Sequence, residues 1–174
     1  ELEPTITADT DLDAVLANDV VLLVVPAQAL REVCRRRGKT GPAVAVICAK
    51  GFERDTDLLL SQVAEDEWPD TKVACLSGPS FAAEVAEGLP TALTLGVADP
   101  ALGRALAERL SSSTLRVYWT DDRTGVEIGG AVKNVLAIAA GLVIGKGLGE
   151  NARAALLSRG LAELAGLGQA LGAR

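Results

Sequence analysis

The feature that most constrains this chain is a regular alternation of short apolar runs with segments of helical spacing. Five runs are predicted to be strands, at 20–25, 43–49, 72–77, 91–98 and 115–120. The segments predicted to be helices lie between them, at 27–37, 58–68, 80–87 and 100–111. Runs such as VVLLVV lack polar alternation, which is typical of strands buried on both faces. The pattern predicts a doubly wound α/β fold with a mainly parallel sheet.

The pattern changes after about residue 123, where no further strand is predicted. Two long helices are expected instead, at 125–143 and 151–167. The glycine-rich stretch between them follows a helix and not a strand, so it does not fit the context of a dinucleotide-binding loop. We expect a tight interhelical turn there, with Glu150 or Asn151 as the cap of the second helix. The chain is therefore expected to divide into an α/β part, 1–123, and the start of an all-α part, 124–174.

Open sheets of this kind bind ligands beyond the carboxyl ends of their strands. The residues just past the predicted strands are Pro26, Lys50-Gly51, Gly78-Pro79-Ser80 and Thr120-Asp121. Gly51 would allow a sharp turn or a close approach to a ligand. The turn at 77–81 leads into a helix, whose free N–H groups suit an anionic or carbonyl ligand. Lys50 could equally be a surface lysine at a strand end, and the turn at 77–81 an ordinary connection.

One charged side chain, Lys133, interrupts the apolar stretch IGGAVKNVLAIAAGLVIG at 128–145. Burial would lower the pKa of this lysine and suit it to donate or accept a proton, unless an anion restores the charge. It could also reach solvent at a domain boundary or pair with Glu127. The stretch is long enough to span a membrane, but a central lysine opposes insertion by about 2.5–3.5 kcal/mol. We expect a helix buried between two domains and no membrane span.

Composition excludes several classes of function. The net charge is −6, and the one basic cluster, 35–37 with Lys39, is expected at a helix C-terminus, so no nucleic-acid partner is predicted. Three cysteines without CxxC spacing indicate no metal site and favour a reducing, cytoplasmic setting. The chain has no histidine, so acid–base chemistry would fall to other side chains such as lysine.

Several longer motifs, in order, resemble one family. They are VPAQALREV at 25–33, CAKGFE at 48–53, SGPSFAAEVAEGLPTA at 77–92, TGVEIGGAVKNVLAIAAG at 124–141 and GENARAALLSRGLAEL at 149–164. Together they resemble bacterial NAD(P)-dependent sn-glycerol-3-phosphate dehydrogenases over almost the whole chain. The resemblance implies a partial Rossmann-like domain that uses NAD or NADP. It also implies reversible reduction of dihydroxyacetone phosphate to sn-glycerol 3-phosphate, which supplies phospholipid synthesis; the oligomeric state stays open, with a homodimer as one option.

The resemblance also implies roles for single residues. Lys133 matches the lysine that donates or accepts the proton at the C2 oxygen of the substrate. The residues implied to bind substrate are Lys50, Gly78, Ser80, Lys133 and Asn134. Those implied to bind the cofactor are Pro26, Lys50 and Ala82.

The chain differs from the family in extent. The family's glycine-rich loop is expected upstream of Glu1, and further substrate-domain residues, including an Asp and a Ser-Arg-Asn stretch, beyond Arg174. A chain of this extent is expected to be inactive or very weakly active alone, and its residues do not distinguish NAD from NADP. Two other interpretations stay open: another lysine-dependent Rossmann dehydrogenase that acts on hydroxy acids, and a non-catalytic assembly module.

Overall fold

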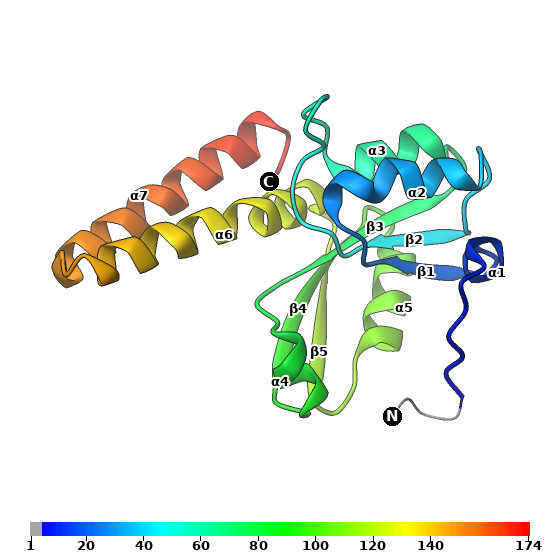
Figure 1. Cartoon of the computed structure of the whole chain (residues 1–174), viewed down its shortest axis with the longest axis horizontal. Coiled ribbons are helices and arrows are strands. Elements are labelled where there is room, and N and C mark those ends of the chain that lie inside the picture. The colour runs from blue at the N-terminus through cyan, green and yellow to red at the C-terminus, as the bar shows by residue number, and fades with distance from the viewer. Residues whose placement is uncertain (1–4) are drawn as a thin grey trace.

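The computed structural model describes residues 5–174, which form a five-stranded sheet covered by helices and a projecting pair of long helices (Figure 1). The strands are β1 (Val20–Leu23), β2 (Val44–Ile47), β3 (Lys72–Ser77), β4 (Thr91–Gly96) and β5 (Leu115–Thr120), in that order across the sheet. The helices are α1 (Leu12–Leu16), the 3₁₀ turn η1 (Ala27–Ala29), α2 (Leu30–Arg36), α3 (Leu60–Glu67), α4 (Ala82–Ala86), α5 (Pro100–Leu110), α6 (Arg123–Gly145) and α7 (Gly149–Ala170). The predicted Rossmann-like, mostly parallel fold followed by helices is confirmed.

Three of the four strand pairs are parallel, but β4 runs antiparallel to β3, with Cys75 opposite Gly96. A parallel return would need a connection that crosses the sheet, usually through a helix. The helix between β3 and β4 is the five-residue α4, which is exposed throughout and covers neither face. Because β5 runs opposite to β3, Thr120 and Asp121 do not follow the same parallel edge as Lys50 and Gly78; Thr120 pairs with Gly96 of β4, which lies opposite Cys75 of β3.

Each face of the sheet carries its own apolar cluster. On one face, Leu16, Leu30 and Trp68 from α1, α2 and the end of α3 pack on alternate residues of β1, β2 and β3. On the other, Leu106 of α5 packs on the intervening residues of β2 and β3 and on β4 and β5. All four residues of β2 are buried, which explains why this strand has an unbroken apolar sequence.

The basic cluster closes α2, as predicted, and belongs to an ion-pair network. Arg31 donates from Nε and Nη2 to the two carboxylate oxygens of Glu53, at 2.7 and 2.8 Å, and from Nη1 to Glu67 at 2.8 Å. Arg35 Nε reaches the same Glu67 oxygen at 3.0 Å. The hydrogen bonds from Arg31 lower the pKa of Glu53 to about 2. The network fixes the loop after β2 against α2 and α3.

The long helix α6 lies against the sheet only along its first part. An ideal Cβ at Gly96 would lie 2.7 Å from Arg123 Cα, so the first turn of α6 rests directly on β4. Further along, only Ile128 and Gly130 are buried, whereas Val135 and Ile138 are 63% and 67% exposed. Within the described residues, the expected burial of this helix between two domains is therefore wrong for most of its length. Judged by length and composition, α6 is the one helix in residues 5–174 that could cross a membrane.

The turn between α6 and α7 is tight, as predicted, with Gly147 and Gly149 at φ of 64° and 83°. However, α7 begins at Gly149, and its N-cap Leu148 provides no side-chain hydrogen bond. The expected cap by Glu150 or Asn151 is wrong, because both residues lie inside the first turn. Glu150 instead pairs with Arg153 at 2.6 Å, one helical turn away.

Candidate functional site

The loops that follow β1 and β2 are tied together at the carboxyl ends of these parallel strands. Gln28 donates from Nε2 to the Phe52 carbonyl at 2.8 Å and accepts from the Arg54 amide at 3.0 Å. Gly51 has a φ of 133° and faces Ala27, with 3.5 Å between its ideal Cβ and that of Ala27. A side chain at residue 51 would therefore be strained. Pro26 and Lys50 leave this shared edge as exposed residues, in agreement with the predicted position of both.

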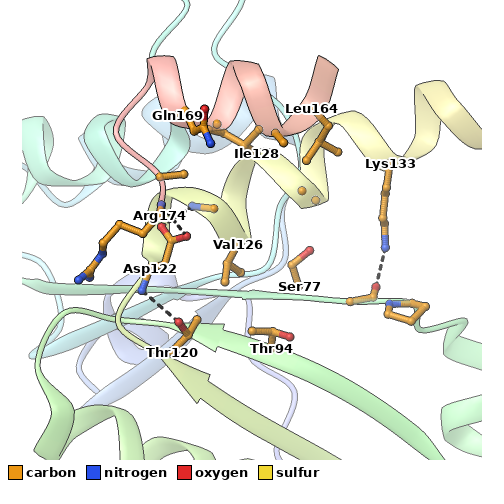
Figure 2. Close-up of a pocket in the computed structure, with 18 residues that line it drawn as sticks. Ser77, Thr94, Thr120, Asp122, Val126, Ile128, Lys133, Leu164, Gln169 and Arg174 are labelled. Carbon is orange, nitrogen blue, oxygen red and sulfur yellow. Dashed lines mark hydrogen bonds between the residues drawn. The ribbon is translucent and has the colours of Figure 1, made fainter. Parts of the chain in front are cut away.

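Lys133 extends from α6 to the end of β3. Its Nζ donates a hydrogen bond of 2.5 Å to the Gly78 carbonyl oxygen (Figure 2). Burial lowers the pKa of Lys133, and the positive charge of Lys50 lowers it further. Two of the predicted lysines, from separate elements, are thus close enough to interact. An ammonium group with a lowered pKa is suited to donate a proton to a developing oxyanion.

Gly130 allows α6 to approach the end of β3. An ideal Cβ at this position would lie 2.5 Å from Ser77 Oγ and 3.7 Å from Lys50 Cγ. The preceding Gly129 has no such neighbour within 4 Å. Gly130 thus marks the point where α6 meets both β3 and the loop after β2, one helical turn before Lys133.

A pocket of about 550 Å³ runs beside α6, with Lys133 at one end. Figure 2 shows Asp122 and Arg174 at the other end and the hydroxyls of Ser77, Thr94 and Thr120 between them. Its volume falls within the range of small-molecule sites, and its walls combine apolar side chains with a few polar groups, as such sites do. The walls come from β3, β4, β5, α6 and α7 and include Gly78, Val126, Ile128, Leu164 and Gln169.

Five predicted site residues do not line this pocket: Pro26 and Lys50, which lie at the edge beyond β1 and β2, and Ser80, Ala82 and Asn134. Ser80 and Ala82 are exposed and lie past Gly78, at the start of the α4 segment. Asn134 is also exposed, because one step along a helix turns a side chain by about 100° away from that of Lys133. Their roles remain predictions. Within residues 5–174, no cluster of three or more Cys, Asp or Glu side chains is placed to bind a metal ion.

Two contacts near Lys133 were not foreseen from the sequence. The suggested pairing of Lys133 with Glu127 is not formed; Glu127 accepts hydrogen bonds from Ser61 instead. Ser77, the first residue of the predicted turn at 77–81, also lines the pocket, although only Gly78 and Ser80 of that turn were assigned a role. Neither contact leaves a local sequence signal, since Ser61 and Glu127 are 66 residues apart.

Comparison with known proteins assigns the family. Residues 1–103 match the family described as NAD-dependent glycerol-3-phosphate dehydrogenase N-terminus, and residues 122–174 match the corresponding C-terminus. The chain is 52% identical to the glycerol-3-phosphate dehydrogenase [NAD(P)+] of Paramagnetospirillum magneticum, covering 100% of this chain and 64% of that protein. The chain is 54% identical to the protein of the same name from Rhodospirillum rubrum, over 99% of this chain and 50% of that protein.

Solved structures agree with this assignment. The glycerol-3-phosphate dehydrogenase of Coxiella burnetii superposes with a TM-score of 0.82 at 41% identity, covering 90% of this chain and 48% of that chain. A ketopantoate reductase from Ralstonia eutropha shares the fold alone, with a TM-score of 0.61 at 17% identity over 97% of this chain and 57% of its own. The chain thus spans about half to two thirds of the length of the two curated relatives named above. On these matches, the chain belongs to the NAD-dependent glycerol-3-phosphate dehydrogenase family.

Proposed function

We propose that this chain forms the part of a glycerol-3-phosphate dehydrogenase in which the nicotinamide cofactor and dihydroxyacetone phosphate meet. The observation that carries the proposal is the placement of Lys133, which lies 2.5 Å from the Gly78 carbonyl and within the electrostatic influence of Lys50. The named relatives support the reaction, which is the reversible reduction of dihydroxyacetone phosphate to sn-glycerol 3-phosphate.

In the proposed mechanism, Lys133 donates a proton to the C2 oxygen of the ketone as the alcohol forms, and accepts it in the reverse direction. The cofactor, when bound, supplies or receives the hydride at C2. The Gly78 carbonyl holds the ammonium group in place before the substrate arrives. The lowered pKa of Lys133 makes its proton easier to release than that of an exposed lysine. The two lysines together also favour a substrate that carries a phosphate.

The edge beyond β1 and β2 fits the nicotinamide cofactor. Pro26 and Lys50 are exposed on two loops that Gln28 joins, and Gly51 keeps the backbone there free of a side chain. We propose that Pro26 and Lys50 hold NAD or NADP, with Ala82 added from the resemblance. Lys50, Gly78 and Lys133 would contact the substrate. Ser80 and Asn134 are included among the substrate-binding residues because the family resemblance implies that role.

We further propose that α6 is a packing helix of a cytoplasmic enzyme that supplies phospholipid synthesis, and not a membrane span. Glu127 and Lys133 both bond to the α/β part of the chain, which fixes α6 beside the sheet. Residues 1–123 would then belong to the nucleotide-binding domain and 124–174 to the substrate domain. The exposed apolar side chains of α6 and α7 offer a surface for a homodimer.

The proposal is tested in a full-length protein of the family that carries these residues. Oxidation of NADH and NADPH is followed with dihydroxyacetone phosphate, with dihydroxyacetone and with ketopantoate. The phosphorylated ketone is expected to be reduced far faster than the other two. Preferential reduction of ketopantoate would favour a hydroxy-acid dehydrogenase, and no reduction of any ketone would favour an assembly module. The 174-residue chain alone is expected to show little or no turnover.

A further inference from the structure

We infer that Glu127 is a positioning residue, which docks α6 on the start of α3 and so sets Lys133 against the end of β3. The inference rests on the proposed function of Lys133 and adds to it a residue that does not itself touch substrate or cofactor. No hydrogen bond or ion pair joins Glu127 to Lys133 in residues 5–174. The influence of Glu127 on Lys133 is inferred to pass through the placement of the helix, and the variant Glu127→Gln separates this from an effect of its charge.

The contact between Glu127 and Ser61 is bidentate and partly buried. Glu127 Oε1 accepts from the Ser61 backbone N–H at 2.9 Å, and Oε2 accepts from the Ser61 hydroxyl at 2.5 Å. Ser61 is only 1% exposed and is the second residue of α3. A buried N–H and hydroxyl that lose their acceptor are costly to leave unsatisfied. Glu127 is thus the partner on which the start of α3 depends.

The carboxylate also suits the electrostatics of this helix end. The first turn of α3 contains no acidic residue of its own, and its N-cap Leu59 has a side chain without hydrogen-bonding atoms. A negative charge at a helix N-terminus is favourable, because the unpaired N–H groups there carry partial positive charge. Glu127 of α6 therefore provides the negative charge at the N-terminus of α3 that no residue in the first turn of α3 provides.

Glu127 lies close enough to Lys133 along α6 for its contact with α3 to affect the position of Lys133. It precedes Lys133 by six residues, a rise of about 9 Å along the helix. Gly130, between them, is in contact with Ser77 and Lys50, whereas Val135 and Ile138 beyond them are 63% and 67% exposed. Apolar contacts of the buried Ile128 and of Val126 hold the segment before Lys133 against the sheet, whereas the helix beyond Lys133 is mostly exposed. The position of this segment is set by those contacts together with the contacts at Arg123, Glu127 and Gly130.

The second polar anchor of α6 is the more exposed one. Arg123 binds Glu65 of α3 with 2.5 Å between Nη1 and Oε1, and their side chains are 26% and 43% exposed. Ion pairs that solvent reaches contribute little to stability. The charged groups around this part of α6 are Lys50 from the loop after β2, Glu65 from α3, and Arg123 and Glu127 of α6 itself. Arg123 and Glu127 each form two partly buried hydrogen bonds to α3, but only the partner of Glu127, Ser61, is itself buried, at 1% exposed.

The test uses four variants of a full-length protein of the family that carries these residues. Glu127→Ala removes both hydrogen bonds, and Ser61→Ala removes only the one from the hydroxyl. Glu127→Gln removes the charge but keeps an oxygen for the Ser61 N–H and a polar group for its hydroxyl. Glu163→Ala is the matched control, because Glu163 is a glutamate on α7 that is 66% exposed and pairs only with Arg159.

Three quantities are measured for each variant. They are kcat with dihydroxyacetone phosphate, the Kd for NADH, and the pH midpoint for acylation of Lys133 by a water-soluble active ester, read from its own peptide by mass spectrometry. The midpoint reports the pKa of Lys133 whether or not the protein is active. The midpoint reports a change in the surroundings of Lys133. The Kd for NADH shows whether the protein is still folded.

A positioning role gives a defined pattern. Glu127→Ala is expected to lower kcat by about 10- to 100-fold, since a displacement of about 1 Å at a reacting group can cost up to 100-fold. Its Kd for NADH should be unchanged, and its acylation midpoint should rise toward that of an exposed lysine as Lys133 becomes hydrated. Ser61→Ala and Glu127→Gln should each change both quantities in the same direction but less than Glu127→Ala, because each keeps part of the docking contact. Glu163→Ala should resemble the wild type.

Other patterns overturn the inference. The first is a kcat and an acylation midpoint in Glu127→Ala that equal the wild-type values. The second is an effect of Glu127→Gln as large as that of Glu127→Ala, which would show that Glu127 acts on Lys133 through its charge and not by docking α6. If Glu127→Ala does not fold, unchanged values in Ser61→Ala overturn it. If the wild type itself reduces no dihydroxyacetone phosphate, the proposed function fails, while the acylation midpoints still decide whether Glu127 places Lys133.

Discussion

Gly130 of α6 and Ser77 of β3 are packed so closely that a Cβ atom at residue 130 would lie 2.5 Å from Ser77 Oγ. This contact lies between Glu127 and Lys133 on the helix and beside Gly78 on the strand. It determines how near the proposed proton donor can come to the end of β3. The absence of a side chain at residue 130 is thus a structural requirement of the site.

Gly130→Ala is expected to destabilise the protein by about 1–3 kcal/mol, the usual cost of overpacking, and to lower kcat by shifting Lys133. Alanine is otherwise the better helix former, so propensity alone would stabilise by about 0.5–1 kcal/mol. Gly129→Ala is the matched control, because it has the same propensity gain and nothing within 4 Å. Equal melting temperatures for the two variants would contradict the packing described here.

The charge of Lys50 is expected to act on Lys133 directly. Burial is the main reason for the lowered pKa of Lys133, and Lys50 contributes a further lowering. Lys50→Met removes the positive charge and keeps an unbranched side chain, so the pKa of Lys133 should rise. The pH midpoint for acylation of Lys133 measures this. A midpoint that stays constant or falls would show that the two ammonium groups do not interact.

The ion pair of Arg31 and Glu53 is expected to make stability sensitive to acid. The pKa of Glu53 falls from an ordinary 4.5 to about 2, so folding favours the carboxylate. Its contribution is fully present above pH 4.5, and is lost as the pH falls through 4.5 toward 2. The shift corresponds to roughly 3 kcal/mol, since one pKa unit is about 1.4 kcal/mol.

Unfolding by urea at a series of pH values checks this. Glu53→Gln should be less stable than the wild type near neutral pH, and the gap should narrow as the solution is acidified. A gap that is independent of pH between 2 and 4.5 would contradict the assignment of the low pKa to Glu53.

Gly103 of α5 is expected to tolerate no side chain. Trp119 of β5 donates from its indole N–H to the Val97 carbonyl at 3.0 Å, and its ring occupies the space where a Cβ of residue 103 would lie. Gly103→Ala should therefore lower the free energy of unfolding by about 1–3 kcal/mol or displace the indole. Gly141→Ala is the control and should be neutral or stabilising, because Gly141 lies in the last part of α6 with nothing within 4 Å of an ideal Cβ. An unchanged tryptophan environment and stability in Gly103→Ala would contradict this packing.

The sequence predicted most elements, and the misses have physical causes. The strands at 72–77 and 115–120 have the predicted bounds. The direction of β4 could not be read, because it depends on whether the intervening segment crosses the sheet, and α4 does not. The helix α1 was missed because it has only five residues, although Asp11 caps it with a hydrogen bond to the Asp13 amide.

The site was predictable where it depends on local rules. Lys50 and Gly78 follow from the rule that ligands bind beyond strand ends, and Lys133 from its isolation in an apolar helix. The docking of Glu127 on Ser61 could not be predicted, because it depends on how a long helix packs across the sheet. Likewise, no sequence pattern distinguishes Gly130, which contacts Ser77, from Gly129, which contacts nothing.

Proton transfer by Lys133 at the C2 oxygen is tested most directly by the kcat of Lys133→Ala in a full-length protein of the family that carries these residues. Loss of a positioned acid–base group is expected to lower kcat by about 100- to 10,000-fold. The Kd for NADH should stay near the wild-type value, because Lys133 binds Gly78 and not the edge at Pro26. A wild-type kcat for Lys133→Ala would contradict proton transfer by Lys133 and leave this residue with a structural role alone.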